Sequence, residues 1–454
     1  MSWAATGVAF GQTVQILYAF SGTDGAIPLD GLVLADDGNF YGTTYYGGDG
    51  GNGNVFRISP EGVYTNLHSF QDTPDGSYPV SGLTRGRDGY LYGTCALGGV
   101  FGGGTVFRLS LTGDYTNLYS FNAPPDGSTP YCRLVLGEDG FIYGTTEYGG
   151  AYTDTGGTFF RIGSSGDYTN LFSFGSSTND GNRPNSLMQA NDGYFYGMTL
   201  IGGTSNLGTI FRINRNGSNY SILHSFGTIT NDGEWPYPAT LVPGPDGFLY
   251  GCVANGGINY YGTIFRLSTN GVYTNLYLFT DLATGASPNG GLILGSDGNL
   301  YGSCGGGITN NRPGRGGIIY RLSPAGVYSN LYAFKGAPDG DGSYQLVQGL
   351  DGDFYGTTQA GGNGAGTVFK FSMPLNPPAN QITALRLNGS SVNVSVSSIA
   401  GASYQLQQRD SLTSGTWTNV PGASVINSIG ATITVTNFAG AADPQQFFRF
   451  AVTP

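Results

Sequence analysis

The sequence predicts an all-β protein whose main domain is a seven-bladed β-propeller closed by an N-terminal strand and followed by a small β-sandwich. The pattern Asp-Gly-x-x-Tyr-Gly occurs seven times, and its copies lie 51 to 54 residues apart. A constant period of this size is typical of a repeat architecture. The copies begin at Asp37, Asp88, Asp139, Asp192, Asp246, Asp297 and Asp351.

Each repeat contains four short β-type segments, which in the first repeat fall at 31–34, 40–44, 54–59 and 64–70. They are rich in Val, Ile, Thr, Tyr and Phe and are separated by Gly, Asp, Asn and Pro, which predicts antiparallel strands joined by tight turns. A lone four-stranded sheet cannot bury both of its apolar faces. Seven such sheets packed around an axis can, and this favours a propeller.

The two ends of the repeat region indicate how the ring closes. The seventh repeat stops after its third strand, at 367–371, whereas residues 14–20 match the fourth strand at 115–121 and have no partner strands before them. We therefore expect a propeller over residues 12–372 in which the N-terminal strand completes the last blade. Closure of this kind removes two open sheet edges.

Composition excludes some classes of partner. The net charge is −11, which argues against nucleic acid or an anionic membrane surface, because both select a basic face. No apolar run reaches the roughly 18 residues that a membrane span needs. Charged residues make up only 10% of the chain, below the usual figure of about 25%, whereas Gly and Tyr are abundant.

The N-terminus and the cysteines bear on the compartment. Residues 1–11 are small and apolar, and they suggest either the remnant of a signal peptide or a disordered leader. The chain has four cysteines, at 95, 132, 252 and 304. We expect free buried thiols, with a disulfide between Cys95 and Cys132 as the alternative, because both fall near the same rim of neighbouring blades.

Residues 373–380 contain three prolines and interrupt the repeat, which predicts a stiff linker. Alternating strands follow in 381–454, for example at 391–396, 404–408 and 447–452. With Trp417 as a core aromatic, this segment is predicted to be a fibronectin-III- or immunoglobulin-like β-sandwich.

The ordered segments Gly-Leu-Val-Leu, Asp-Gly-x-x-Tyr-Gly-Thr-Thr, Gly-Thr-Val-Phe-Arg and Tyr-Thr-Asn-Leu-Tyr-Ser-Phe resemble the GloVer tandem-repeat family of exported bacterial proteins across residues 14–372. The C-terminal segment, with 404–407, 416–420 and 447–449, is similar to fibronectin-III-like modules of exported bacterial proteins. The resemblance implies a secreted or cell-surface protein and supplies no activity.

A weaker likeness to streptogramin lyases and NHL-type propellers concerns the fold alone. Such a lyase would need a metal-assisted histidine base. The only histidines, His68 and His224, occupy a slot that is aromatic in the other repeats, so we expect both to be structural.

Features shared by all repeats are expected to maintain the blades. The Asp-Gly pairs suit hairpin turns, and the basic position of the third strand (for example Arg57 and Lys370) is expected to be paired within or between sheets. A second series of Asp residues precedes the first strands. We expect no cofactor, although Ca²⁺ bound by this series is an alternative. The series comprises Asp24, Asp75, Asp126, Asp180, Asp232 and Asp339.

Function is expected where the repeats differ, on the face formed by the loops from fourth to first and from second to third strands. Aromatic rings there could stack on sugars and the polar groups could bind hydroxyls, although such rings could also fill gaps between blades. The candidate ligand-binding residues are Tyr131, Arg133, Glu147, Tyr148, Arg183, Glu234, Trp235 and Tyr237.

Two functions from different classes are consistent with this face. The first is an extracellular or cell-surface binding or scaffold propeller whose partner is a glycan or a protein. The alternative is a polysaccharide-degrading enzyme, either a lyase or a glycoside hydrolase. In that case Glu147 and Glu234 would be the two carboxylates, which belong roughly 5–10 Å apart, and Arg183 or Tyr237 would engage a uronate.

Overall fold

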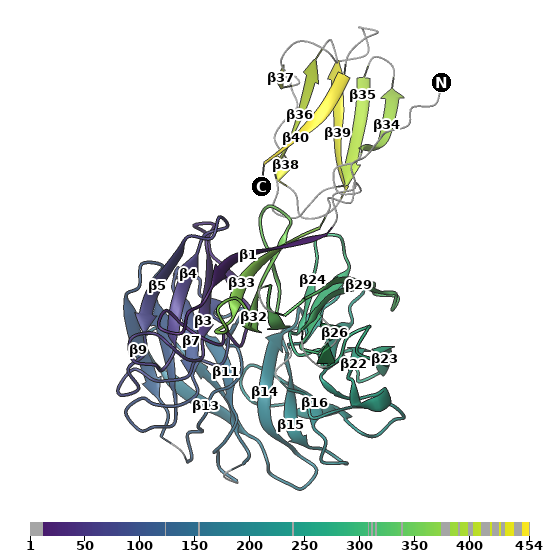
Figure 1. The fold of residues 1–454 in the computed structure, drawn as a ribbon. Coiled ribbons are helices and arrows are strands. Elements are labelled where there is room, and N and C mark those ends of the chain that lie inside the picture. The colour runs from purple at the N-terminus through teal and green to yellow at the C-terminus, as the bar shows by residue number, and fades with distance from the viewer. Residues whose placement is uncertain are drawn as a thin grey trace.

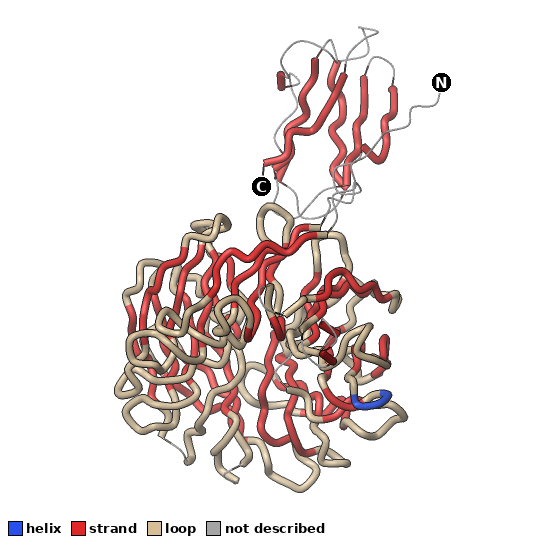
Figure 2. Tube along the Cα trace, viewed as in Figure 1, coloured by secondary structure: helices blue, strands red, loops and turns tan. Residues whose placement is uncertain are grey.

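The computed structural model describes residues 12–373, apart from 123, 153–154, 238–239, 307, 310–311, 314–315 and 337–338, and beyond them the strands β34–β40. Seven antiparallel sheets form a ring (Figures 1 and 2). The predicted seven-bladed propeller is therefore confirmed. Outside the strands, the described residues contain one 3-10 turn, η1 (Ile258–Tyr260), and none of their helices is long and apolar enough to cross a membrane.

Strand order is the same in every blade, from the channel outward. The first strands are β2 (Val33–Leu34), β6 (Thr84–Arg85), β10 (Val135–Leu136), β14 (Gly181–Gln189), β19 (Val242–Pro243), β24 (Leu292–Leu294) and β31 (Val347–Gln348). The second strands are β3 (Phe40–Thr44), β7 (Leu91–Cys95), β11 (Ile142–Thr146), β15 (Phe195–Gly202), β20 (Leu249–Val253), β25 (Leu300–Cys304) and β32 (Phe354–Ala360). The third strands are β4 (Asn54–Ile58), β8 (Thr105–Leu109), β12 (Thr158–Ile162), β16 (Thr209–Ile213), β22 (Thr263–Leu267), β28 (Ile318–Leu322) and β33 (Thr367–Ser372). The outer strands are β5 (Tyr64–Ser69), β9 (Tyr115–Ser120), β13 (Tyr168–Ser173), β17 (Ser221–Ser225), β23 (Tyr273–Leu278), β29 (Tyr328–Ala333) and β1 (Thr13–Ala19).

Short additional strand pairs lie in the loops. They are β18 (Gly233–Glu234) with β21 (Asn255–Gly256), β26 (Ile308–Thr309) with β27 (Arg312–Pro313), and β30 (Asp341–Ser343) with β32.

The N-terminal strand closes the ring as predicted. Strand β1 pairs antiparallel with β33, from Thr13 opposite Ser372 to Ala19 opposite Thr367 (Figure 1). The amide of Phe20 then donates to the carbonyl of Gly366 at 3.0 Å, and the Phe20 side chain is fully buried. Residues from the two ends of the repeat region thus share one sheet and one core.

The recurring Asp-Gly-x-x-Tyr-Gly pattern forms a hydrogen bond within each blade. Gly38 takes a φ of 78°, which suits glycine in the hairpin, and the buried Tyr41 donates its hydroxyl to Asp37 Oδ2 at 2.7 Å. At Gly42 an added Cβ would lie 2.7 Å from Cζ of Phe56, so only glycine leaves room for that ring. The hydroxyl-to-carboxylate bond spans 2.6–2.9 Å in all seven blades, between Tyr41 and Asp37, Tyr92 and Asp88, Tyr143 and Asp139, Tyr196 and Asp192, Tyr250 and Asp246, Tyr301 and Asp297, and Tyr355 and Asp351.

A stacked pair of rings joins neighbouring blades. Tyr18 of β1 stacks on Tyr64 of β5 with centroids 4.2 Å apart, and the Tyr18 hydroxyl donates to Asp24 at 2.5 Å. Equivalent stacks have centroids 3.8–4.6 Å apart at five further interfaces, between His68 and Tyr115, Tyr119 and Tyr168, Phe172 and Tyr220, His224 and Tyr273, and Tyr277 and Tyr328. The second series of Asp residues therefore lies at the blade interfaces.

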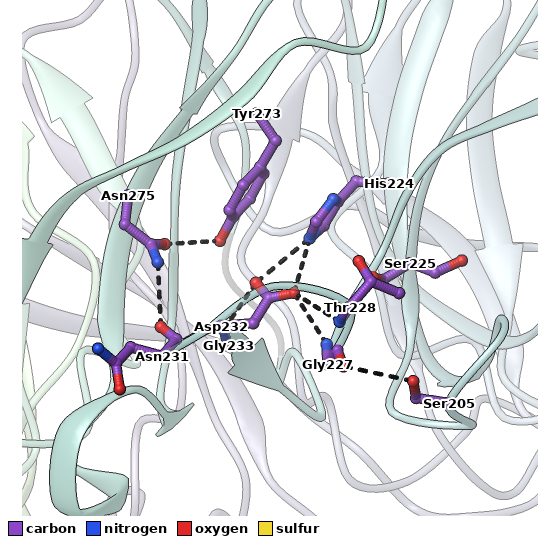
Figure 3. Close-up of polar contacts among 10 residues, drawn as sticks. All are labelled: Ser205, His224, Ser225, Gly227, Thr228, Asn231, Asp232, Gly233, Tyr273 and Asn275. Carbon is purple, nitrogen blue, oxygen red and sulfur yellow. Dashed lines mark hydrogen bonds and ion pairs between the residues drawn. The ribbon is translucent and has the colours of Figure 1, made fainter.

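The two histidines replace an aromatic ring, as expected. His224 lies parallel to Tyr273, with centroids 3.8 Å apart, and its Nε2 is 3.0 Å from Asp232 Oδ2 (Figure 3). Asp232 also accepts hydrogen bonds from the amides of Gly227, Thr228 and Gly233, so both of its carboxylate oxygens already have partners. Within the described part of the chain, no group of three or more His, Cys, Asp or Glu side chains could hold a metal ion.

The basic position of the third strand packs against its own blade, and Arg108 and Arg212 also donate to a backbone carbonyl of the next blade. Four arginines lie over an aromatic ring of the same blade with the guanidinium carbon 4.6–5.3 Å from its centroid, and these are Arg108, Arg161, Arg212 and Arg266. Lys370 binds Asp351 at 2.6 Å and Asp353 at 3.0 Å. The expected pairing is confirmed at these positions.

All four cysteines are free and buried, so the alternative disulfide between Cys95 and Cys132 is wrong. The Cys132 thiol instead bonds to the backbone of Thr145, whose amide donates to Sγ at 3.1 Å. Cys95 lies in β7, against Gly76 and close to Thr105.

The C-terminal segment forms two sheets. Strands β34 (Ile382–Asn388), β35 (Ser391–Ser397) and β39 (Thr432–Ala439) make one sheet. The other contains β36 (Ser403–Arg409), β37 (Thr418–Asn419), β38 (Ile426–Asn427) and β40 (Phe447–Thr453). Two separate antiparallel sheets are consistent with the predicted sandwich. The predicted leader at 1–11, the predicted linker at 373–380 apart from its first residue, and the core residue Trp417 lie outside the described residues.

Deleting residues 12–20 should destabilise the propeller severely. The change leaves the edge of β33 open and removes the buried Phe20, whose loss alone is expected to cost about 3–5 kcal/mol. Scanning calorimetry should show a lower and less cooperative transition. A chain lacking only residues 1–11 is the control. Equal melting temperatures of the two truncated chains would contradict closure by β1.

His68→Tyr should remove a pH dependence of stability. Burial lowers the pKa of His68 below its usual 6.5, although Asp75 opposes this shift. The unfolded chain then binds a proton that the folded chain resists, so the free energy of unfolding falls as the pH drops below about 6.5. A tyrosine can donate to Asp75 as Tyr18 does to Asp24, without titrating in this range. Urea unfolding near pH 7.5 and near pH 5.5 should show a smaller loss for His68→Tyr than for the wild type; an equal loss would exclude this explanation.

Candidate functional site

A cavity of about 250 Å³ lies at the loop end of the central channel, where the segments that lead into the first strands converge. All seven blades contribute to its wall. The lining residues are Leu29, Asp30, Val80, Tyr131, Arg133, Asn185, Ser186, Tyr237, Thr240, Asn289, Gly290, Gly291, Tyr344, Gln345 and Gln359.

One position of the repeat accounts for much of this wall. It is the residue immediately before the leucine of each first strand. Three repeats have glycine there, Gly31, Gly82 and Gly291, and the other four have larger polar side chains, Arg133, Ser186, Thr240 and Gln345. An otherwise regular ring is therefore asymmetric at its axis.

Three of these side chains span the channel, and together we call Arg133, Gln345 and Thr240 the cross-channel bar. Arg133 donates Nη1 to Gln345 Oε1 at 3.0 Å, and Gln345 donates Nε2 to Thr240 Oγ1 at 3.1 Å. Nε and Nη2 of Arg133 both donate to the Leu83 carbonyl, at 3.1 and 2.7 Å. Because arginine can only donate, the orientation of the Gln345 amide is fixed.

A second cavity, of about 380 Å³, lies beyond the bar. Arg133 and Thr240 belong to the walls of both cavities. The second cavity is lined mainly by aliphatic side chains, among them Leu83, Leu134 and Leu187. The bar therefore lies between a loop-side chamber, called the polar chamber for its tyrosine and amide side chains, and a mainly aliphatic one.

Tyrosine rings form the rim of the polar chamber. The hydroxyls of Tyr131 and Tyr237 are 3.2 Å apart, and their rings meet edge to face with centroids separated by 6.2 Å. Burial, reinforced by the nearby Tyr237, raises the pKa of Tyr344 to about 12, and burial together with the Tyr237 hydroxyl raises the pKa of Tyr131. These hydroxyls therefore stay neutral, able both to donate and to accept hydrogen bonds.

Two amide oxygens in the wall have no donor within the protein. Asn185 is 4% exposed and donates its Nδ2 to the Pro236 carbonyl at 2.6 Å, which leaves Oδ1 unpaired. Oδ1 of Asn289 is likewise buried and unpaired. Buried polar atoms without a partner are costly. Seven further side-chain atoms of the described residues share this property, but only these two belong to residues of the cavity wall, where a ligand that donates hydrogen bonds would pair them.

The charged groups of the wall are already engaged. Asp30 accepts hydrogen bonds from the amides of Gly31 and Gly82 at 2.6 and 2.5 Å, and Arg133 donates to Gln345 within the bar. The wall contains one carboxylate and one guanidinium, so its formal charge is zero. The groups left for a ligand are neutral hydroxyls and amides.

Of the residues predicted from the sequence, Tyr131, Arg133 and Tyr237 line this cavity. Arg183 instead forms an ion pair with Glu147, with Nε 2.8 Å from Oε1, and lies 4.8 Å from the ring centroid of Tyr148. Their charges satisfy each other, so the three residues support the rim beside the cavity and do not belong to its wall.

The remaining two predicted residues lie on the fifth-blade loop. Glu234 is held in the β18–β21 pair, and Trp235 is 45% exposed at a φ of 48°. Neither lines the cavity. Sequence reasoning missed Asp30, Asn185, Asn289, Tyr344 and Gln345. A signal for Gln345 was present, because it stands before the first-strand leucine at a position where other repeats have glycine.

Arg183→Met should destabilise the propeller by roughly 1–3 kcal/mol, less than for a fully buried pair, because Glu147 is 8% exposed but the Arg183 side chain keeps 27% of its surface in solvent. The variant leaves Glu147 as an unpaired, largely buried carboxylate. Urea denaturation measures the loss. Adding Glu147→Gln should restore part of it, and a double variant less stable than the single one would contradict the pairing.

Comparison with known proteins identifies the repeat and the fold. A family model described as the Gloeobacter/Verrucomicrobia repeat matches residues 7–180 and 153–336, which confirms the resemblance to the GloVer tandem repeats. No curated protein matches the chain.

Several solved propellers are similar to this chain in structure. An oligogalacturonate lyase in complex with manganese has a TM-score of 0.53 at 13% identity, over 81% of this chain and 95% of the lyase. A puromycin hydrolase has a TM-score of 0.49 at 13% identity, over 84% of this chain and 60% of the hydrolase. A gluconolactonase from Xanthomonas campestris has a TM-score of 0.40 at 13% identity, over 81% of this chain and 91% of that one. At 13% identity, the match to the lyase, whose TM-score is 0.53, establishes the fold alone.

Proposed function

The chain belongs to the Gloeobacter/Verrucomicrobia repeat family, and we propose that it is an extracellular or cell-surface binding propeller that takes a carbohydrate at the loop end of its central channel. The observation that carries the proposal is the cavity wall. It combines a tyrosine rim with two buried amide oxygens that have no partner in the protein.

Both the apolar face of a sugar ring and its hydroxyl groups find partners in this wall. The C–H face of a sugar ring packs against aromatic rings, which Tyr131, Tyr237 and Tyr344 provide. Sugar hydroxyls are donors, and Oδ1 of Asn185 and of Asn289 are acceptors that require them. A small number of fixed polar groups in a partly aromatic cavity is the usual composition of a small-ligand site.

A neutral sugar fits better than a uronate. The Arg133 guanidinium already donates to Leu83 and Gln345, and Arg183 is paired with Glu147 outside the cavity. With a net charge of −11 the chain also repels polyanions. Tyr237 remains a contact residue, but through its ring and hydroxyl.

The enzyme alternative has less support. Neither Glu147 nor Glu234 lines the cavity, and Glu147 is bound to Arg183. The carboxylate in the wall, Asp30, accepts two backbone amides. General acid and base catalysis needs carboxyl groups free to exchange protons with the substrate, so a binding role is favoured.

Tyr237→Ala should weaken carbohydrate binding by on the order of 1–3 kcal/mol, because the ring forms part of the rim and is 48% exposed. A glycan array that includes neutral and polyanionic chains would identify the ligand, and titration calorimetry would then compare the variants. Trp235→Ala and Tyr260→Ala, which remove loop rings outside the cavity wall, are controls expected to bind normally.

Equal loss of affinity in Trp235→Ala and Tyr237→Ala would shift the site from the cavity to the loop surface. A reducing-sugar assay on every glycan bound tests the enzyme alternative. Release of product would overturn the assignment as a binding protein.

A further inference from the structure

Building on the proposed carbohydrate site, we propose that the cavity is a blind pocket that receives the terminal unit of a neutral glycan end-on, with the cross-channel bar as its floor. A propeller channel that is open throughout could thread a chain or bind it only around the rim. The arrangement at the axis of this ring favours neither, for three independent reasons.

The first reason is the floor itself. Arg133 of the third blade, Gln345 of the seventh and Thr240 of the fifth are joined by hydrogen bonds of 3.0 and 3.1 Å across the channel. Two further bonds from Arg133 to the Leu83 carbonyl anchor the bar to the second blade. Four hydrogen bonds hold these side chains in one arrangement, so the floor is preorganised.

Glycine at the same repeat position in other blades provides the space that the bar occupies. A Cβ added at Gly31 would lie 2.6 Å from the Gln345 carbonyl oxygen, and one added at Gly291 would lie 3.2 Å from Thr240 Oγ1. The glycines and the long side chains therefore depend on each other. Larger residues in those two blades would displace the bar.

The second reason is the contrast between the two chambers. Below the bar the wall is mainly aliphatic, with Leu83, Leu134, Leu136, Leu187 and Met188 among its residues. The other polar side chains of this wall are already engaged, Thr84 with the Leu134 carbonyl, Arg85 with Asp36, and Gln189 with the backbone of Glu138 and Gly193. A sugar chain that passed through would therefore bury hydroxyls with few free partners, which is costly. Above the bar, the unpaired Oδ1 atoms and tyrosine hydroxyls offer the partners that hydroxyls need.

The third reason is the size and chemistry of the upper chamber. At about 250 Å³ it is smaller than the roughly 300–1,000 Å³ of typical small-ligand sites, which suits one sugar ring rather than several. A terminal unit also keeps a hydroxyl that an internal unit has lost to its glycosidic bond. That additional donor is what a wall with two unpaired acceptors selects.

The test compares free and blocked chain ends. Neutral gluco-, manno-, galacto- and xylo-oligosaccharides are titrated into the full chain. Each is compared with the same oligosaccharide in which both terminal units are blocked. The non-reducing terminal unit is blocked as a cyclic acetal and the reducing terminal unit as a bulky glycoside. We expect the free forms to bind and the corresponding monosaccharide to compete with them. The blocked forms should bind at least about tenfold more weakly than the free forms.

Equal binding of free and blocked forms would overturn end-on recognition while leaving the carbohydrate function intact. Absence of binding by all neutral oligosaccharides would overturn both proposals. The two failures are thus distinguishable.

Asn289→Ala provides a second readout that does not depend on the floor. Because its Oδ1 has no partner in the protein, its removal should leave the melting temperature unchanged, yet weaken binding of free oligosaccharides about tenfold. Asn259→Ala is the matched control, since Asn259 lies on a loop of the fifth blade outside the cavity wall. Unchanged affinity in Asn289→Ala would overturn recognition of a terminal hydroxyl by the unpaired acceptors.

Discussion

The hydrogen bond from a buried tyrosine hydroxyl to the aspartate of its own hairpin is the interaction on which the rest of this ring depends. It recurs in all seven blades with distances of 2.6–2.9 Å. Burying a tyrosine in a β-sheet core is costly unless its hydroxyl finds a partner, and the Asp supplies one four residues earlier. The ring of Tyr41 then packs in the core while the turn before it is fixed.

Packing between blades uses the same two residue types in another geometry. Rings such as Tyr18 and Tyr64 stack across an interface, and Asp24 accepts the hydroxyl of the first. His68 and His224 fit this slot because an imidazole is flat, stacks on tyrosine and can bond to the same aspartate. Ring stacks recur at six interfaces, and the hydrogen bonds that the aspartates beside them accept leave those carboxylates little capacity for metal ions.

Regular blades allow irregularity at the axis. The first strands need only a leucine for the core, so the residue before it is free to vary between glycine and a long polar side chain. Arg133, Thr240 and Gln345 exploit this freedom, and the space left by Gly31 and Gly291 accommodates them. Charge is neutralised within the wall, which leaves hydroxyl and amide groups as the means of recognition.

The sequence by itself determined the fold, because period, strand pattern and the displaced fourth strand are local properties that can be counted along the chain. It also located the face on which the repeats differ, and Tyr131, Arg133 and Tyr237 within it. Only the tertiary structure decided that Arg183 is bound to Glu147 rather than to a ligand, and that Arg133 reaches Gln345, 212 positions later in the chain. The physical reason is that strand formation follows from neighbouring residues, whereas the partner of a side chain at the axis depends on how seven blades converge there.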